Sequence, residues 1–281
     1  MGEIEKSEFI TSDYTIQGLK EYVSTRIAEI EASHQAEQPG DISILADEVD
    51  QLIAALKADS RKGASRLAES LEKKQLAASI DLKAWDKREE MVAELRSQGY
   101  QYICGIDEAG RGPLAGPVAV GAVILPVEAY IAGLDDSKKL SAGKRESLTS
   151  EIREKAVSSA VALIDNETID EVNIGQAVRL AARTAISKLD REPDYLLLDG
   201  GLRLDSVDLP QQAVIDGDAK VNAIAAASVL AKVTRDNLMD KYHQEYPDYN
   251  FLSNKGYGTA EHMAAIEESG LSPIHRMTFI N

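Results

Sequence analysis

The stretch from Tyr102 to Pro117, YICGIDEAGRGPLAGP, places two adjacent carboxylates between an apolar run and a glycine-rich turn. Residues 103–106 are mostly apolar and favour a buried strand that leads into Asp107 and Glu108. The glycines that follow let the backbone bend tightly and let a bulky ligand approach. We therefore expect a strand whose end presents two acids to a cleft.

Two further apolar runs end in acids. Residues 194–199, DYLLLD, end in Asp199 before two glycines, and residues 213–218, AVIDGD, contain Asp216 and Asp218. Hard divalent cations prefer oxygen ligands, so a site that handles phosphate esters usually gathers several carboxylates. Asp-Gly is also common turn chemistry, and an Asp after a strand often caps a helix. Three occurrences in one region favour a carboxylate cluster.

The surrounding sequence indicates an α/β domain in which strands alternate with helices. Residues 118–125 and 158–164 are expected to form strands, and residues 174–189 a buried helix with a small-residue face. A longer helix is expected over 221–246, its Ala- and Ser-rich first half packing under the sheet. Such a composition is more typical of tight packing than of chemistry. A threonine is expected to cap a helix over 259–268.

The first part of the chain is a separate region, because the acidic motifs begin only at residue 102. We assign residues 1–98 to a mainly helical N-terminal extension and residues 99–281 to the α/β domain. Gln38-Pro39-Gly40 interrupts the extension. Helical patterns follow that break over residues 42–56, 60–76 and 80–95. Substrate handling, a partner contact or simple packing remain open as the role of the extension.

Six ordered motifs between residues 102 and 279 resemble bacterial ribonuclease HII, the type 2 ribonuclease H. They are GIDEAGRGPLAGPVAVGAVIL, DSKKL, LLLDG, GDAKVNAIAAASVLAKVTRD, GYGT and PIHRMTF. The resemblance implies a ribonuclease H-like mixed sheet flanked by helices. It also implies an endonuclease that hydrolyses the RNA strand of RNA/DNA hybrids and nicks duplex DNA on the 5′ side of an embedded ribonucleotide. Such an enzyme removes ribonucleotides and processes primers during DNA replication and repair.

The resemblance assigns catalysis and metal binding to four acids, with Mn²⁺ or Mg²⁺ as cofactor and two ions during hydrolysis. These acids are Asp107, Glu108, Asp199 and Asp218. The chain departs from many relatives at Asp216, where they carry a lysine. That extra charge, and the nearby Asp236, leave the identity of the fourth ligand open.

The resemblance also assigns substrate recognition. Gly110, Arg111 and Gly112 are expected to sense the ribose 2′-hydroxyl through the backbone, and Tyr257 is expected to pack on the sugar at the RNA-to-DNA junction. Two alternatives stay open. Arg111 has the spacing of a salt-bridge partner of Glu108, and Tyr257 has the context of a packed surface aromatic.

The overall charge argues against nucleic acid, because the chain has a formal net charge of −16 and a pI near 4.7. Metal ions would neutralise the acids, and local basic groups are expected to line one face. Lys138 and Lys139 are placed near phosphates, although they also fit ordinary solvated lysines. The other candidates are Lys144, Arg145, Lys220, Lys232, Arg235 and Lys255. We expect weak, strongly salt-dependent binding to RNA/DNA hybrids and to duplex DNA containing ribonucleotides.

The sequence shows no signal peptide and no transmembrane run, and its single cysteine, Cys104, fits a buried strand. We expect a cytoplasmic monomer with no membrane contact and no required protein partner. Two other classes of protein fit the motifs less well. A junction resolvase would need the acids but not the Gly-Arg-Gly and GYGT motifs, and a non-catalytic hybrid-binding protein would be expected to lack one of the acids. His275-Arg276 has no role that the sequence defines.

Overall fold

The computed structural model describes residues 11, 14–33 and 39–280, with side chains described at residues 11, 14–25 and 48–280. It separates into two compact units, Met1–Ala84 and Trp85–Asn281. The division falls inside helix α3 (Lys62–Ser97), whereas the sequence suggested a boundary at residue 98, just after that helix ends. Within the described residues, no helix combines the length and apolar character needed to cross a membrane.

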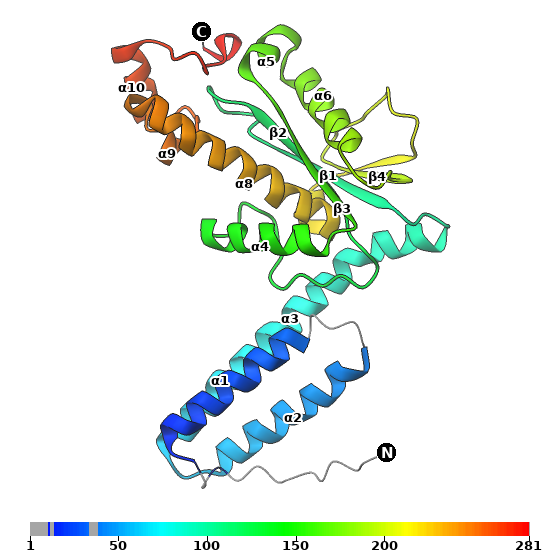
Figure 1. Cartoon of the computed structure of the whole chain (residues 1–281), viewed down its shortest axis with the longest axis vertical. Coiled ribbons are helices and arrows are strands. Elements are labelled where there is room, and N and C mark those ends of the chain that lie inside the picture. The colour runs from blue at the N-terminus through cyan, green and yellow to red at the C-terminus, as the bar shows by residue number, and fades with distance from the viewer. Residues whose placement is uncertain (1–10, 12–13, 34–38, 281) are drawn as a thin grey trace. The chain divides into compact units, whose positions relative to one another are not determined.

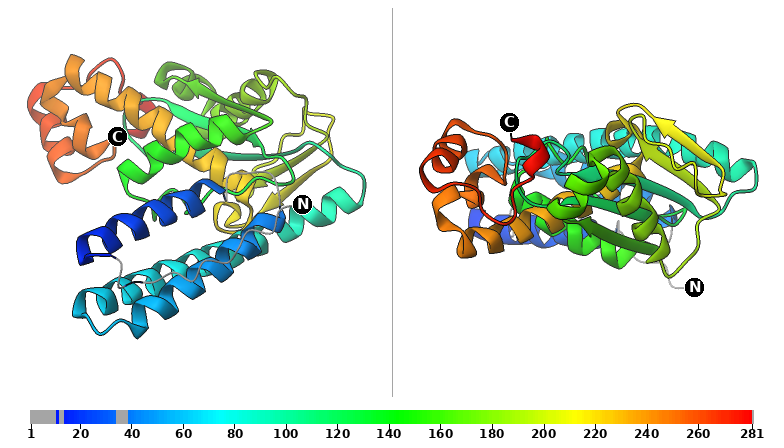
Figure 2. Two further views of the ribbon diagram at one scale, coloured as in Figure 1. Left: turned by 60° about the horizontal axis from the view of Figure 1, so that its bottom comes forward. Right: turned by 90° about the horizontal axis from the view of Figure 1, so that it is seen from above.

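The first unit consists of α1 (Ile16–Ser33), α2 (Pro39–Ala58) and the first part of α3. Buried side chains from all three helices form its core; they include Leu19, Leu56 and Leu71. Figure 2 shows the ribbon of these helices in two further views. Proline is favoured at the first position of a helix, which agrees with the start of α2 at Pro39. The predicted segments 60–76 and 80–95 form one continuous helix of 36 residues. Gln38 lies outside the described residues.

The second unit contains a five-stranded mixed sheet in the order β3-β2-β1-β4-β5 (Figure 1). The strands β1, β2 and β3 pair antiparallel, while β4 pairs parallel with both β1 and β5. Strands β2 and β3 confirm the two strands predicted from the sequence. The bounds are β1 (Ile103–Ala109), β2 (Val118–Ile124), β3 (Ser158–Ile164), β4 (Tyr195–Asp199) and β5 (Gln211–Val214).

Helices cover both faces of this sheet. The helices α5 (Asn166–Val172) and α6 (Ile174–Ser187) pack on one face, against side chains such as Ile106 and Leu198. The other face packs against α8 (Asn222–Glu245), α4 (Ala142–Lys155) and the last part of α3, through side chains such as Ile103 and Leu197. The two-residue period of the strands produces this alternation. Figure 1 shows α6 and α8 on opposite sides of the sheet.

The close approach of α8 to the sheet depends on small residues. A Cβ atom added to Gly105 in β1 would lie 2.2 Å from the carbonyl carbon of Ala223, and one added to Gly121 in β2 would lie 2.2 Å from the carbonyl oxygen of Ala227. Only glycine fits at such distances, so the helix backbone rests directly on the strands. The helix predicted over 221–246 is confirmed in this position.

The chain then ends in short elements beyond α8. Thr259 Oγ1 accepts a hydrogen bond from the backbone N of His262 at 3.2 Å and caps α10 (Ala260–Ser269). Gly270 ends that helix, as predicted. Residues between β5 and α8 form the short helix α7 (Gly217–Lys220). The remaining elements are η2 (Pro247–Tyr249), α9 (Phe251–Asn254), α10 (Ala260–Ser269) and η3 (Met277–Phe279).

Candidate active site

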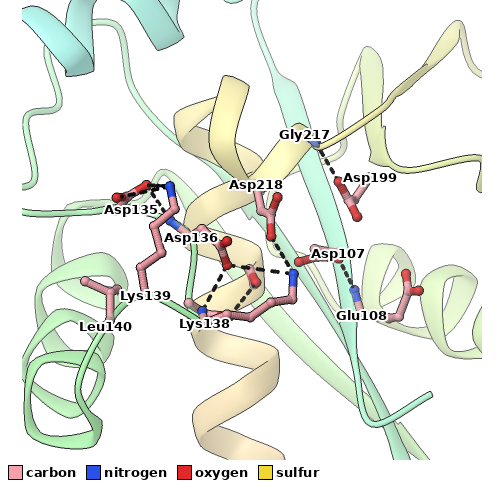
Figure 3. A network of polar contacts seen from close by, with 12 residues as sticks. Asp107, Glu108, Asp135, Asp136, Lys138, Lys139, Leu140, Asp199, Gly217 and Asp218 are labelled. Carbon is pink, nitrogen blue, oxygen red and sulfur yellow. Dashed lines mark hydrogen bonds and ion pairs between the residues drawn. The ribbon is translucent and has the colours of Figure 1, made fainter. Parts of the chain in front are cut away.

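Three of the four predicted acids gather beside the end of β4 (Figure 3). Parallel pairing of β1 with β4 places Ile106 opposite Leu198, so Asp107 and Asp199 follow on neighbouring strands. Asp199 Oδ1 accepts a hydrogen bond of 2.6 Å from the backbone N of Gly217, which brings Asp218 on α7 alongside. Three separate segments of the chain therefore contribute carboxylates to one place.

Glu108 points away from its neighbour because β1 continues through Ala109 instead of ending before the acids. Adjacent side chains of a strand face opposite sides of the sheet. Glu108 Oε1 lies 3.3 Å from Nη1 of Arg111, so the salt bridge predicted as an alternative for this arginine is formed. The substrate role of Arg111 stays a prediction.

The acids raise one another's pKa. Burial raises the pKa of Asp107 well above its usual range, and the neighbouring Asp199 carboxylate raises it further. Burial also raises the pKa of Asp199, an effect that the hydrogen bond from Gly217 opposes. Burial raises the pKa of Glu108, and Arg111 partly offsets the increase. The cluster carries more negative charge than its surroundings stabilise, which suits a cationic ligand.

Lys138 supplies a counter-charge to this cluster. Its Nζ donates to Asp218 Oδ2 at 2.8 Å and lies 3.7 Å from Asp136 Oδ1. The hydrogen bond to Asp218 raises the pKa of Lys138. Lys139 instead extends away from the acids and donates to Asp135 Oδ1 at 3.1 Å (Figure 3). The two lysines placed together by the sequence thus have different partners.

The two alternative ligands have partners of their own. Asp216 is exposed in a left-handed conformation with φ 53°, and its Oδ2 lies 3.8 Å from Lys220 Nζ. Asp236 accepts a hydrogen bond of 2.8 Å from Lys232 and lies 4.0 Å from Arg145. Asp218, which is 5% exposed, is therefore better placed than either residue to act with Asp107 and Asp199.

The acids match the donor set of a hard divalent cation, although their side chains do not converge on a single point. Within the part of the chain that the structure describes, no three His, Cys, Asp or Glu side chains are close enough to hold a metal ion. The strand alternation turns Glu108 aside, and the Lys138 ammonium group binds Asp218. The oxygen ligands and their unrelieved charge nevertheless fit such an ion.

Two serines that the sequence did not single out support Asp107. The Asp107 carboxylate accepts a hydrogen bond from the Ser228 hydroxyl on α8, and Ser137 Oγ lies 2.9 Å from Ser228 Oγ. When Asp107 is ionised, Ser228 donates to it, so Ser137 must donate to Ser228. The Ala- and Ser-rich helix therefore also positions a candidate catalytic acid, a role that its composition did not indicate.

The Gly-Arg-Gly loop is held from beneath by a buried arginine. Arg276 is 0% exposed, and it donates to the carbonyl oxygens of Gly110, Arg111 and Gly116 at 2.6, 3.0 and 2.9 Å. Three carbonyl groups thus depend on one guanidinium group. This observation gives the His275-Arg276 motif a structural role that the sequence left open.

The segment containing Tyr257 lies against the same loop. Leu114 N donates to Gly256 O at 2.8 Å, and a Cβ atom added to Gly112 would lie 3.9 Å from Tyr257 Cε1. Tyr257 is 45% exposed. Tyr257 is therefore at the surface beside Gly112, with part of its ring free to contact a ligand.

Comparison with known proteins identifies the family. The model of the family described as "Ribonuclease HII" matches residues 104–281. This chain belongs to the ribonuclease HII family. It is 46% identical to the ribonuclease HII of Enterococcus faecalis over 233 residues, which cover 83% of this chain and 91% of that protein. It is 48% identical to that of Bacillus licheniformis, over 84% of this chain and 91% of the relative.

Solved structures agree with this membership. The crystal structure of ribonuclease H2 from Pyrococcus horikoshii has a TM-score of 0.54 and 26% identity, over 63% of this chain and 92% of that one. Bst-RNase HIII in complex with Mn²⁺ has a TM-score of 0.52 at 19% identity, over 66% and 69% of the two chains, and shows the shared fold. The predicted fold class is confirmed, and the chain is a ribonuclease H endonuclease.

Two buried histidines of this ribonuclease HII connect the C-terminal segment to Tyr257. His262 Nδ1 lies 2.9 Å from the carbonyl oxygen of Tyr257, so it carries a proton and leaves Nε2 as an acceptor. His275 Nε2, 3.0 Å from His262 Nε2, must then be the donor. His275 Nδ1 accepts hydrogen bonds from the backbone N and the hydroxyl of Ser272. Both tautomers follow from these partners.

Several basic groups proposed for substrate binding are used within the protein. Arg235 is 0% exposed and donates to the carbonyl oxygens of Ala115, Pro117 and Lys255, so its predicted place on a surface was wrong. Arg145 donates to the carbonyl oxygen of Ser137 at 2.9 Å. In this ribonuclease HII, buried arginines shape the loops that frame the acids.

Proposed function

We propose that this ribonuclease H nicks duplex DNA on the 5′ side of an embedded ribonucleotide, in addition to cutting the RNA strand of RNA/DNA hybrids. In this proposal the reaction depends on Mg²⁺ or Mn²⁺, with two ions during hydrolysis. The ligands would be Asp107, Glu108, Asp199 and Asp218. All of these residues belong to one chain, so the proposal requires no second protein and is compatible with a monomer.

The observation that carries the proposal is the continuity between the acids and a glycine-rich surface loop. Strand β1 contains Asp107 and leads directly into Gly110-Arg111-Gly112, which Arg276 fixes from below and Tyr257 adjoins. A 2′-hydroxyl is the group that distinguishes ribose from deoxyribose, and unobstructed backbone groups are able to detect it. A ribonucleotide bound at this loop would have its phosphate near the acids.

Each group then has a defined task. The Ser228 hydroxyl orients the Asp107 carboxylate, and the backbone N of Gly217 orients the Asp199 carboxylate. Both would serve as oxygen ligands. A divalent ion held by these carboxylates would supply the activation of water and the charge stabilisation that the reaction needs. Lys138 carries the counter-charge of Asp218 at 2.8 Å, and we expect a divalent ion to compete with it. Tyr257 would pack against the sugar that follows the ribonucleotide.

The test is cleavage of a labelled DNA duplex that contains one ribonucleotide, with Mg²⁺, with Mn²⁺ and with chelator, beside an all-DNA duplex. Metal-dependent nicking on the 5′ side of the ribonucleotide, with the all-DNA duplex intact, is the expected result. Cleavage of long hybrids without that nick would remove the junction-recognition role from Gly110, Arg111, Gly112 and Tyr257.

Two variants sharpen this test. Asp199→Asn keeps the size of the side chain but removes a carboxylate, and it should abolish cleavage while leaving hybrid binding largely intact. Asp216→Asn changes an exposed acid outside the cluster and should leave cleavage within about threefold of wild type. Turnover by Asp199→Asn at the wild-type rate would exclude Asp199 from the metal site.

A further inference from the structure

The buried arginine Arg88 lies on α3, before residue 104, where the match to the ribonuclease HII family model begins. Its Nε donates to Asn222 Oδ1 at 2.7 Å, and its Nη2 donates to the carbonyl oxygen of Leu134 at 2.7 Å. The side chain belongs to the same compact unit as the acids. One rigid guanidinium fork thus joins the start of α8 to the loop before Lys138.

On the helix side, Arg88 fixes residues 217–222, which run from α7 to the start of α8, are called the corner and contain Asp218. Asn222 is fully buried and is the first residue of α8, four positions after Asp218. Besides accepting from Arg88, its amide donates to the carbonyl oxygen of Trp85 at 3.1 Å and to Glu89 Oε1 at 2.8 Å. All these hydrogen bonds of the Asn222 side chain go to α3, so α3 determines where α8 begins.

On the loop side, one ion pair and a series of hydrogen bonds lead from Arg88 to Lys138, the partner of Asp218. Arg88 Nη1 lies 3.6 Å from Asp135 Oδ1, which accepts from the backbone N of Asp136. Asp136 Oδ1 accepts from the backbone N of Lys138, and Lys138 Nζ returns to Asp218. These contacts, together with the backbone from Asp218 to Asn222, form a closed circuit that includes Arg88 and the Lys138–Asp218 pair (Figure 3 shows the loop and the pair).

We propose that Arg88 is a positioning residue for the active site, which sets the loop containing Lys138 against the corner containing Asp218. It touches neither substrate nor reacting atoms and acts through Asn222 and Leu134. The role in cleavage rests on the proposed function of Lys138 and Asp218. The last part of α3 then positions the active site, although it precedes residue 104, where the match to the family model begins.

The test compares full-length Arg88→Ala and Arg88→Lys with wild type by two independent measurements. Hydrogen–deuterium exchange followed by mass spectrometry reports on residues 134–140 and 217–222, and steady-state cleavage of the single-ribonucleotide duplex reports on kcat and KM. We expect several-fold faster exchange in both segments. We also expect kcat to fall about 10- to 100-fold with KM changed less than about threefold, because misplaced groups slow chemistry more than binding.

Arg88→Lys tests whether the fork itself is needed. A lysine retains the positive charge beside Asp135 but has no planar fork to reach Asn222 and Leu134 together. We expect exchange and kcat close to those of Arg88→Ala. Full activity in Arg88→Lys would overturn the joint positioning of helix and loop, and this variant also serves if Arg88→Ala fails to fold.

Arg96→Ala is the matched control. Arg96 lies on the same helix, and its Nη2 donates to the carbonyl oxygen of Leu125 at 3.0 Å. It lies 3.8 Å from Glu89 Oε2, whereas Asn222 binds Oε1 of that residue. Both alanine variants should lower the melting temperature, but only Arg88→Ala should change exchange at the site and kcat.

The outcomes separate this inference from the proposed function. Unchanged exchange in both segments of Arg88→Ala, or the same change in Arg96→Ala, would overturn the positioning role. Faster exchange with an unchanged kcat would overturn its importance for cleavage. If the wild-type protein does not cut the single-ribonucleotide duplex, the proposed function fails, and the exchange experiment still decides whether Arg88 sets the loop and the corner.

Discussion

The buried histidine pair beside Tyr257 should make the free energy of unfolding fall as the pH is lowered. Burial, and to a smaller extent the neighbouring His262, lower the pKa of His275 to about 4, from the usual 6.5 that applies in the unfolded chain. Between these values the unfolded chain binds a proton that the folded chain excludes. Stability is therefore lost as the pH falls through 6.5, by about 3 kcal/mol when the pH reaches 4. Urea unfolding at about pH 7.5 and about pH 5 measures the first part of this loss, about 2 kcal/mol.

The control for this prediction must separate the histidine from the acids. The raised pKa values of Asp107 and Asp199 act with the opposite sign, since their folded forms keep protons that the unfolded chain has lost. The contribution of His275 is thus the difference in pH dependence between wild type and His275→Asn, with His243→Gln as the histidine control. An identical pH dependence in wild type and His275→Asn would contradict the prediction.

Among the structural elements, the contact between β1 and α8 tolerates no added atom at Gly105. The Cβ of Gly105→Ala would overlap the backbone of Ala223 at 2.2 Å, and neither the strand nor the helix backbone moves cheaply. We expect a loss of about 3 kcal/mol or more in the free energy of unfolding. Thermal denaturation should show a fall of about 6–12 °C in Tm.

Gly143→Ala is the matched substitution in an open position. Nothing lies within 4 Å of a Cβ atom at Gly143, which occupies the first turn of α4. Alanine there restricts the unfolded chain without a clash, so we expect a gain of about 0.5 kcal/mol. A Gly105→Ala protein as stable as Gly143→Ala would show that the strand and helix separate easily.

Elements with strong local signals were predictable from the sequence, and their side-chain partners were not. The apolar runs before Asp107 and Asp199 identified β1 and β4, and the parallel pairing of these strands explains why the two acids meet. The sequence did not predict that β1 continues past Asp107, because Asp and Glu are unusual inside a strand. It therefore did not predict that Glu108 faces the opposite side of the sheet from Asp107. Ser228 gave no signal because a serine among alanines resembles packing.

The buried arginines were hidden for a related reason. A sequence shows the charge of Arg235 and Arg276 but not the carbonyl oxygens that surround them, which come from loops distant in the chain. Counting such residues toward a basic surface therefore overestimates the charge available to nucleic acid. With a net charge of −16, binding to nucleic acid has to rely on where the exposed cations lie and on metal ions.

For the molecule as a whole, the functional boundary of the catalytic unit should lie near residue 84 and not near residue 98. Removal of residues 1–98 deletes Trp85, Val92 and Leu95, which are at least 95% buried in the core beneath α8, together with Arg88. The loss of each large buried side chain costs about 2–5 kcal/mol. Three such losses together are comparable to the total of about 5–15 kcal/mol that stabilises a typical domain. Removal of residues 1–84 leaves that core whole and removes a unit with its own buried cluster.

We therefore expect the protein lacking residues 1–84 to unfold cooperatively and to cut the single-ribonucleotide duplex within about threefold of the wild-type rate. The protein lacking residues 1–98 should be unfolded or insoluble at the same temperature. Circular dichroism melting and the cleavage assay, run on both proteins beside the full chain, measure the difference. Equal melting temperatures for the two shortened proteins would show that the end of α3 contributes nothing to the catalytic unit. Loss of cleavage by a folded protein lacking residues 1–84 would instead assign the first three-helix unit a direct part in handling the substrate.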